Sequence, residues 1–331
     1  MNNTLNFCTV FYSNYLPYGL LLHDSLKKTC PKFHLFIFAL DKKCYHDLKS
    51  LNLSSTTIIS PEEFENDKLL EVREKRTKAE YCWTVTPFTI EYIFRNYKLD
   101  LCTYLDADLF FFSSPDPLIE YIKNKSVLII EHRYTSKYDR SDICGKYNVQ
   151  FITFRNSMVG RQVLNWWSNK CLDWCYFRSE KGKYGDQKYL DDWPNRFKEI
   201  GVIDDLGFGV GPWNMQQYYF LRKNNKIYGI ERSTGKEFLV TFFHFHTIKF
   251  SDSVLDKKQF YSYELTFDAY KLIYKPYLKK FMSIIKKIKE INYPLNFKIN
   301  FAQSIQINIL DYFYFKLKDF KRDLIGHFRL I

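Results

Sequence analysis

The sequence predicts an α/β protein with a mostly parallel sheet flanked by helices, followed by a basic helical tail. Apolar strand patterns alternate with helical patterns along the first 60 residues, which is typical of parallel sheets. Later apolar strands carry carboxylates and imidazoles at their ends, where such sheets bind ligands. The charge is concentrated near the end of the chain. Its 331 residues, 46% of them hydrophobic, can form one large domain with an appendage.

The first five elements set the strand–helix rhythm. They are a strand over Asn6–Tyr12, a helix over Leu20–Lys28, a strand over Lys32–Leu40, a helix ending at Leu48 and a strand over Thr56–Ile59. No Gly-x-Gly-x-x-Gly follows the first strand, which argues against a dinucleotide site, and no P-loop signature occurs. A ligand of another kind is therefore expected at the carboxyl ends of these strands.

The next stretch leads to the most informative strand. Residues Pro61–Lys78 are charged and predict a solvated helix, and Thr86-Pro87 predicts the start of a further helix because Pro favours the first turn. The nearly unbroken apolar run Leu101–Phe112 then predicts a strand buried on both faces.

Two carboxylates, Asp106 and Asp108, interrupt this apolar run. Burying an ionised carboxylate costs several kcal/mol unless a partner compensates for it. A divalent cation that also holds a diphosphate would compensate both groups. The alternative is a turn or helix-cap pair, since Asp is common where strands end.

The second half of the chain continues the pattern. Strands are expected at Ser126–Glu131 and Tyr147–Arg155, a helix at Met158–Cys175, and a glycine-dense loop at Gly207–Asn214. Asp186 either caps the following helix or faces a ligand.

A last apolar strand, Phe238–His246, ends in two histidines. His244 and His246 are two residues apart, so both side chains point to the same face of a strand. Imidazole is a common metal ligand. Either histidine therefore completes a metal site with the two aspartates, and Lys249 follows closely enough to contact a phosphate.

The net charge of +12 belongs mainly to the tail, where residues 271–331 hold 13 Lys and Arg against 4 Asp and Glu. A nucleic-acid-binding role, which needs a basic face on the folded body, is therefore not expected. We divide the chain into a catalytic domain, residues 1–265, and a basic amphipathic tail, residues 266–331. The tail's apolar stripes either lie on an anionic membrane surface or pack on the body. The stripes comprise Leu278, Phe281, Met282, Ile285 and Ile288, and then Ile305, Ile309, Phe313, Leu317, Phe320 and Leu324.

The chain shows no signal peptide and no apolar run long enough to span a membrane. Its eight cysteines are expected to be reduced thiols. These features predict a cytoplasmic protein that is peripheral on the inner face of the plasma membrane.

Seven segments, in order between residues 5 and 250, resemble the GT-A-type nucleotide-diphospho-sugar transferases of bacteria, which are distantly similar to retaining family-8 glycosyltransferases. They are Phe7–Thr9 with Asn14-Tyr15, Arg76–Pro87, Tyr104–Asp108, Tyr147–Asn156, Trp166-Trp167 with Asp186-Gln187, Trp213-Asn214 and Phe243–Phe245. Two positions depart from the pattern. His246-Thr247 stands where Ser-Gly is usual, and Gly211-Pro212 precedes Trp213.

The resemblance implies a metal-dependent transferase that moves a sugar from a nucleotide-diphosphate sugar, expected to be a UDP-sugar, to a glycan or lipid-linked acceptor, as in lipopolysaccharide or capsule synthesis. It implies Mn²⁺ or Mg²⁺ on Asp106, Asp108 and His244, with Asp106 on the metal or on the ribose. Donor contacts are expected from Thr9, Tyr15, Arg76, Asp106 and Lys249.

Asp186 and Gln187 are expected at the sugar and acceptor. Asp186 would be the base of an inverting enzyme, and either residue would stabilise the transition state of a retaining one. The alternative is a non-catalytic nucleotide-sugar or glycan-binding protein with the same fold.

Overall fold

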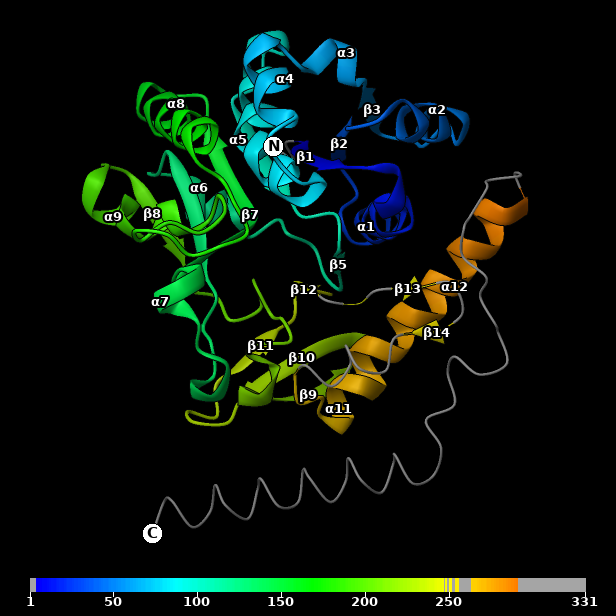
Figure 1. The fold of residues 1–331 in the computed structure, drawn as a ribbon. Coiled ribbons are helices and arrows are strands. Elements are labelled where there is room, and N and C mark those ends of the chain that lie inside the picture. The colour runs from blue at the N-terminus through cyan, green and yellow to red at the C-terminus, as the bar shows by residue number, and fades with distance from the viewer. Residues whose placement is uncertain (1–3, 247, 249, 252–253, 256–262, 291–331) are drawn as a thin grey trace.

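The computed structural model describes residues 4–246, 248, 250–251, 254–255 and 263–290 (Figure 1). A central sheet is flanked by helices on both faces, and a smaller sheet and a long C-terminal helix lie at one end. Among the described residues, no helix is both long and apolar enough to cross a membrane.

The central sheet has seven strands in the order β3-β2-β1-β4-β7-β6-β8. All are parallel to one another except β7, which runs antiparallel to both of its neighbours. The predicted mostly parallel α/β architecture is therefore confirmed. The strands are β1 (Leu5–Phe11), β2 (Phe33–Ala39), β3 (Thr56–Ile59), β4 (Leu101–Leu105), β6 (Val127–Glu131), β7 (Tyr147–Arg155) and β8 (Ile200–Ile203).

The helices alternate with these strands in the first half of the chain. They are α1 (Leu16–Thr29), α2 (Lys42–Ser50), α3 (Pro61–Phe64), α4 (Asp67–Arg73), α5 (Lys78–Asn96), α6 (Leu118–Ile122), α7 (Ser141–Cys144), α8 (Met158–Asp173), α9 (Trp193–Arg196), α11 (Phe267–Ala269) and α12 (Lys275–Glu290). A π-helical turn, Tyr270–Tyr274, joins the last two.

Helix α5 begins earlier than the sequence predicts. Thr77 and Glu80 form a capping box, in which each side chain accepts a hydrogen bond from the other residue's backbone N–H. This cap fixes the helix start at Lys78, so Pro87 lies inside the helix and not in its first turn. The prediction of a helix start at Thr86-Pro87 is wrong, because the capping box outweighs the preference of Pro for the first turn.

The two faces of the sheet carry separate cores. Helices α5 and α8 cover one face, where Val85, Ile90 and Trp167 pack on β1, β4 and β7. Helices α1, α2 and α6 pack on the other face, together with a short two-stranded sheet. The side chains of β1 alternate between these cores, which explains its nearly unbroken apolar sequence.

The predicted strand Leu101–Phe112 is broken at the carboxylates. β4 ends at Leu105 and a separate strand, β5 (Leu109–Phe111), follows Asp108. β5 pairs antiparallel with β12 (Phe242–His244), so that Leu109 stands opposite His244. The expected strand Phe238–His246 is likewise divided, into β11 (Glu237–Leu239) and β12.

The C-terminal helix is part of the folded body. β9 (Tyr218–Lys223), β10 (Lys226–Glu231) and β11 form a three-stranded sheet, and α12 shares an apolar core with it. Two further short strands, β13 (Phe250–Ser251) and β14 (Val254–Leu255), pair with each other. The rings of Tyr277 and Phe245 stack with centroids 3.5 Å apart.

The apolar stripe of α12 is buried, with Leu278, Phe281, Ile285 and Ile288 at most 4% exposed. The expectation that this first stripe lies on a membrane is therefore wrong, and its packing alternative holds. The second stripe, from Ile305 to Leu324, lies outside the described residues.

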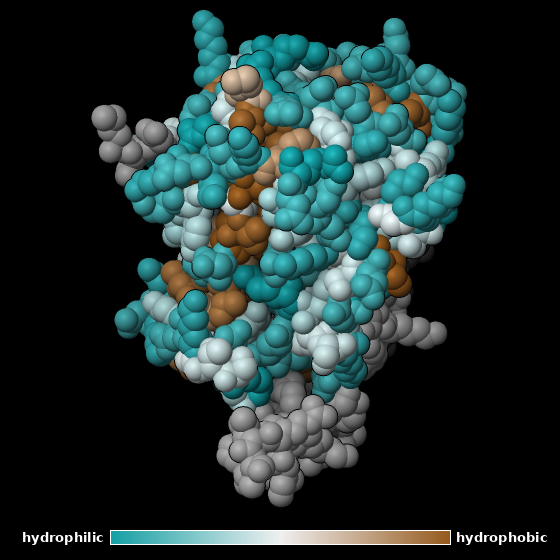
Figure 2. All heavy atoms as spheres, turned by 90° about the vertical axis from the view of Figure 1, so that its left-hand side faces the viewer, coloured by the Kyte–Doolittle hydropathy of each residue, from teal (hydrophilic) through white to brown (hydrophobic). Residues whose placement is uncertain are grey.

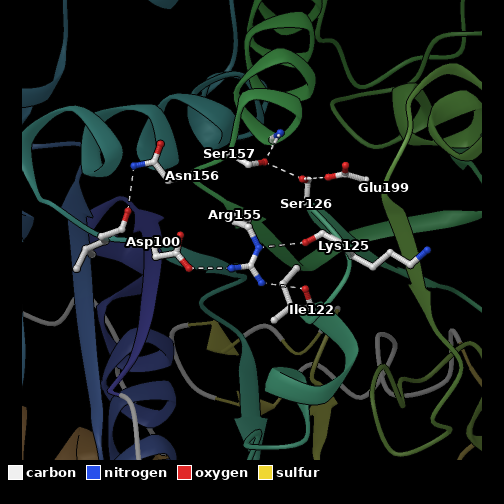
Figure 3. Close-up of polar contacts among 10 residues, drawn as sticks. Asp100, Ile122, Lys125, Ser126, Arg155, Asn156, Ser157 and Glu199 are labelled. Atoms are coloured by element: carbon white, nitrogen blue, oxygen red, sulfur yellow. Dashed lines mark hydrogen bonds and ion pairs between the residues drawn. The ribbon is translucent and has the colours of Figure 1, made fainter. Parts of the chain in front are cut away.

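A polar network lies at the end of the central sheet where β4 begins and β7 ends, away from the candidate site at the end of β4 (Figure 3). The Arg155 guanidinium donates to the Asp100 carboxylate and to the carbonyls of Ile122 and Lys125. Beside it, Ser126 bonds both Ser157 and Glu199. These contacts give the end of β7 a structural role.

The face shown in Figure 2 is mostly hydrophilic, with apolar side chains gathered in a narrow strip. Apolar atoms contribute a large share of the surface of any folded protein, so a narrow strip of this kind does not by itself indicate a partner. All eight cysteines are free in the structure.

Candidate metal centre

Three side chains converge where β4 ends. The ligand atoms of Asp106, Asp108 and His244 all lie within 4.8 Å of one another. His244 Nε2 is 3.0 Å from Asp108 Oδ1 and 3.7 Å from Asp106 Oδ2. His246 is exposed, and His244 is the histidine of this group.

Backbone pairing brings these residues together from distant parts of the sequence. The Asp106 N–H donates to the Gln150 carbonyl at 3.0 Å, and the Phe245 N–H donates to the Asp108 carbonyl at 3.0 Å. His244 is also fixed by its own N–H, which donates to the Val210 carbonyl. The site is therefore part of the sheet framework and not of a loose loop.

The histidine ring is oriented by two neighbours. Its Nδ1 lies 2.8 Å from the Oε1 of Gln150, on β7. The Trp213 ring packs against it edge-on, with centroids 5.4 Å apart, and is itself held by the carbonyl of His132. Nε2 is thereby directed toward the two carboxylates.

The pKa values of Asp106, Asp108 and His244 are shifted in different directions. Burial, together with repulsion by Asp108, raises the pKa of Asp106 to about 6, although His244 partly opposes this shift. Burial would also raise the pKa of Asp108, but attraction and a hydrogen bond from His244 outweigh it and lower that pKa. The pKa of His244 is raised, since the two aspartates outweigh burial.

The residues fit a divalent cation. Two carboxylate oxygens and one imidazole nitrogen form a mixed O/N donor set, which suits Mn²⁺ and is compatible with Mg²⁺. A cation would relieve the repulsion between Asp106 and Asp108. The hydrogen bond at Nδ1 is the outer-shell contact that metal-binding histidines usually have.

Tyr15 and Cys82 lie beside this centre. Burial raises the pKa of the Tyr15 hydroxyl, and the charges of Asp108 and Asp106 raise it further. Burial raises the pKa of the Cys82 thiol, on α5, and the negative charges of Asp106, Asp186 and Asp108 raise it further. The predicted donor residue Tyr15 is therefore close to the carboxylates, and it is 40% exposed.

Asp186, on the loop after α8, is close enough to Asp106 for the two charges to interact. It is 5% exposed, and burial and the nearby Asp106 raise its pKa well above the usual range. The preceding Gly185 packs against the Trp83 ring, and the Asp186 carbonyl accepts a hydrogen bond from the Trp167 indole. The neighbouring Gln187 uses its amide nitrogen to bind the Cys144 carbonyl.

The other predicted donor contacts differ in their surroundings. Thr9 is fully buried in β1, and its hydroxyl has no hydrogen-bond partner among the described residues. The Arg76 guanidinium donates to Thr84 and to the Cys171 and Leu172 carbonyls at the end of α8. These contacts give Arg76 a structural role, and its nucleotide contact stays a prediction. Lys249 lies outside the described residues.

The sequence did not single out Gln150 or His132. Both are buried polar residues at a strand or strand end, and a polar residue inside an otherwise buried strand is the only signal that was present. Gly207 lies in the glycine-dense loop that the sequence predicts. A Cβ at Gly207 would lie 1.9 Å from the Leu239 carbonyl oxygen, so this glycine permits close packing of protein backbone.

No protein-family model matches the chain. Among curated proteins, the uncharacterized protein YfnF of Bacillus subtilis (strain 168) is 31% identical over 232 residues, which cover 68% of this chain and 77% of YfnF. The uncharacterized protein YfnD of the same strain is 27% identical over 298 residues, covering 87% of this chain and 92% of YfnD.

Among solved structures, the galactosyltransferase LgtC in complex with donor and acceptor sugar analogues superposes with a TM-score of 0.51. The superposition covers 84% of this chain and 96% of LgtC at 13% sequence identity. At this identity the likeness concerns the fold alone.

Proposed function

The chain belongs to the family of the uncharacterized Bacillus subtilis protein YfnF and has the GT-A fold, and on this basis we propose that it is a metal-dependent glycosyltransferase. It moves a sugar from a nucleotide-diphosphate sugar to a hydroxyl group of an acceptor. The observation that carries the proposal is the convergence of Asp106, Asp108 and His244 at the end of β4.

In this proposal the three side chains hold Mn²⁺ or Mg²⁺. When bound, the ion supplies a positive charge that stabilises the leaving diphosphate. The chain's own groups do the rest. His244 is presented by β12 and Gln150. Tyr15 is close enough to Asp108 and Asp106 to feel their charges, and its hydroxyl is proposed to contact the donor. Thr9, buried in β1 with no hydrogen-bond partner for its hydroxyl among the described residues, is proposed as a further donor contact.

Asp186 and Gln187 are proposed at the sugar and acceptor. Because the pKa of Asp186 is raised, its carboxyl is protonated over a wider pH range than an ordinary one and can donate a hydrogen bond. The Gln187 amide nitrogen binds Cys144, which leaves its oxygen as the group available to a ligand. Donor contacts from Arg76 and Lys249 complete the proposal.

For the substrates we propose a UDP-sugar donor and a glycan or lipid-linked acceptor of lipopolysaccharide or capsule synthesis. The support is the sequence resemblance described above. A screen of UDP-sugars with Mn²⁺ that monitors release of UDP tests this assignment. We expect metal-dependent release by the wild type and none by Asp108→Asn. The exposed Asp116→Asn serves as the matched control and keeps full activity.

Full activity of Asp108→Asn, or of the wild type in excess EDTA, would contradict the metal role. Thermal stabilisation by UDP and Mn²⁺ without any turnover across the screen would instead favour the non-catalytic binding protein.

Contact with an anionic membrane surface is proposed through exposed lysines of α12, since its apolar side is already buried. They are Lys275, Lys279, Lys286 and Lys287. Binding of this kind is electrostatic and is weakened by salt. We expect the protein to sediment with vesicles containing anionic lipid at low salt and to be released at 0.5 M NaCl. Absence of sedimentation, or sedimentation that salt does not reverse, would contradict this contact.

A further inference from the structure

We propose that Gln150 is a positioning residue of the metal site, whose amide oxygen holds His244 in the tautomer that leaves Nε2 free for a divalent cation. The inference rests on the metal site proposed above and adds to it a residue outside the ligand group. Its basis is a chain of hydrogen bonds through β7.

The first step is the hydrogen bond between the two side chains. Gln150 Oε1 and His244 Nδ1 are 2.8 Å apart, a normal hydrogen-bond distance. An amide oxygen only accepts, so a proton lies on Nδ1. A histidine that ligates a metal is neutral and has one proton, so in the metal-bound state Nε2 presents its lone pair to the cation, on the side of Asp106 and Asp108.

The opposite arrangement has the opposite consequence. If the Gln150 amide nitrogen faced Nδ1, it would donate to that atom, and the imidazole proton would move to Nε2. Nε2–H would then point at Asp108, 3.0 Å away, where the cation is proposed to bind. Metal ligation by His244 and acceptance by the Gln150 oxygen therefore require each other.

The second step is the fixing of Gln150 itself. The residue is fully buried, and its backbone N–H donates to the Asn148 side chain at 2.9 Å. Its carbonyl accepts from the N–H of Asp106 at 3.0 Å. One residue of β7 thus holds Asp106 through its backbone and His244 through its side chain.

The third step is the space left for the amide. Gly209 has φ +88°, and a Cβ there would lie 2.8 Å from Ile130 Cγ2 and 3.2 Å from Gln150 Nε2. A glycine at this position meets the backbone requirement and avoids crowding the amide.

The last step is the stability cost of the Gln150 amide. Its Nε2 is buried with no hydrogen-bond partner among the described residues. A buried donor without a partner costs about 1–3 kcal/mol. An apolar side chain of similar size would avoid this cost. The hydrogen bond that Oε1 accepts from His244 is what a glutamine provides at this position and an apolar residue does not.

The test is a Mn²⁺ titration of the full-length protein, in which the free ion is followed by its electron paramagnetic resonance signal. Gln150→Met removes the acceptor at nearly constant size, and we expect Mn²⁺ to bind at least about 10-fold more weakly. Gln150→Glu retains an oxygen acceptor and should recover most of the affinity. Gln216→Met changes a buried glutamine bound to the Pro212 and Glu264 carbonyls, and should bind as the wild type does.

Equal affinity of wild type and Gln150→Met would overturn the inference while leaving the metal site intact. Equal weakening in Gln150→Met and Gln150→Glu would also overturn it, because the acceptor would then not matter. A wild type that binds no Mn²⁺ would overturn both this inference and the proposed metal site.

A second measurement needs no change at Gln150. In the ¹⁵N-labelled wild type loaded with Mg²⁺, long-range ¹H–¹⁵N correlations identify which ring nitrogen of His244 carries the proton, with His244→Gln providing the assignment. We expect protonation at Nδ1, and protonation at Nε2 would overturn the proposal.

Discussion

At the scale of the residue, Asp186 is a carboxyl whose folded environment opposes its charge. Burial and Asp106 raise its pKa, so the folded protein holds the proton more tightly than the unfolded chain. Because the folded protein binds this proton more tightly, stability is lost as pH rises above the ordinary pKa of an aspartate, near 4. At neutral pH this residue therefore lowers stability, as functional groups often do.

We predict that Asp186→Asn raises the melting temperature at pH 7.5. The amide has nearly the same shape and carries no charge, so the gain should shrink as pH falls toward 4. Differential scanning fluorimetry across this pH range measures it, with the exposed Asp204→Asn as control. A lower melting temperature at pH 7.5 would contradict the electrostatic account.

His132 is a second residue with a large shift, in the other direction. Its ring is buried between Tyr134 and Trp213, and burial lowers its pKa to about 3. In the unfolded chain the His132 imidazole therefore becomes protonated near pH 6.5, whereas in the folded protein it stays neutral at that pH. Stability from this group is complete above that pH and is lost as pH falls through it.

We predict that the wild type loses about 2 kcal/mol more stability between pH 7 and pH 5 than His132→Asn does. Urea unfolding at the two pH values gives the comparison. The variant starts from a lower stability because it loses ring packing, so the slope with pH is the informative quantity. Equal slopes in both proteins would show that His132 is not the titrating group.

At the scale of the element, α8 depends on a residue outside it. Its last carbonyls, at Cys171 and Leu172, accept hydrogen bonds from the Arg76 guanidinium. A cation at a helix C-terminus is favourable because the unpaired carbonyls concentrate negative charge there. The forked guanidinium reaches both carbonyls and Thr84, which an ammonium group cannot do in the same geometry.

Arg76→Lys is therefore expected to lower stability by about 2 kcal/mol. The proposed donor contact predicts in addition that Mn²⁺-dependent UDP binding weakens. Urea unfolding and calorimetric UDP titration measure the two effects separately, and lowered stability with unchanged UDP binding would contradict the donor contact and leave Arg76 with its structural role alone.

At the scale of the whole molecule, α12 packs on the body although it lies beyond the predicted domain boundary at residue 265. α12 contributes Tyr277, Phe281 and Ile285 to the core that it shares with β12 and the β9–β11 sheet. Lys280 also forms an ion pair with Asp24 of α1, at 3.2 Å. The helix therefore closes one end of the body.

Truncation should reveal this boundary. We predict that a chain ending at Glu290 keeps a cooperative thermal transition, whereas one ending at Tyr270 is unfolded or aggregated, because it exposes the core that α12 covers. Circular dichroism melting of both chains measures the difference. Equal melting temperatures would mean that α12 contributes little to the fold.

The sequence predicted those features that local patterns determine. The strands β1, β2, β3 and β7 follow from their apolar runs, and the fold class follows from their alternation with helices. The three converging side chains were also expected, because Asp106, Asp108 and His244 end apolar segments. Metal binding by them remains a prediction.

Other features depend on contacts between distant segments. The breaks in the two long predicted strands arise because β5 and β12 pair with each other outside the main sheet. The burial of the α12 stripe needs a partner surface that an amphipathic pattern does not specify. Gln150 is recognisable only once β7 and β12 are placed together.

Because β5 pairs with β12, the site cannot form during synthesis until the ribosome has translated both segments. Asp108 and His244 are 136 positions apart (244 − 108). At the usual 5–20 residues per second, a ribosome needs roughly 7–27 s to go from one codon to the other. During that interval the nascent chain carries two aspartates without their histidine. A ribosome-bound chain stalled before residue 244 should therefore bind Mn²⁺ far more weakly than the released protein.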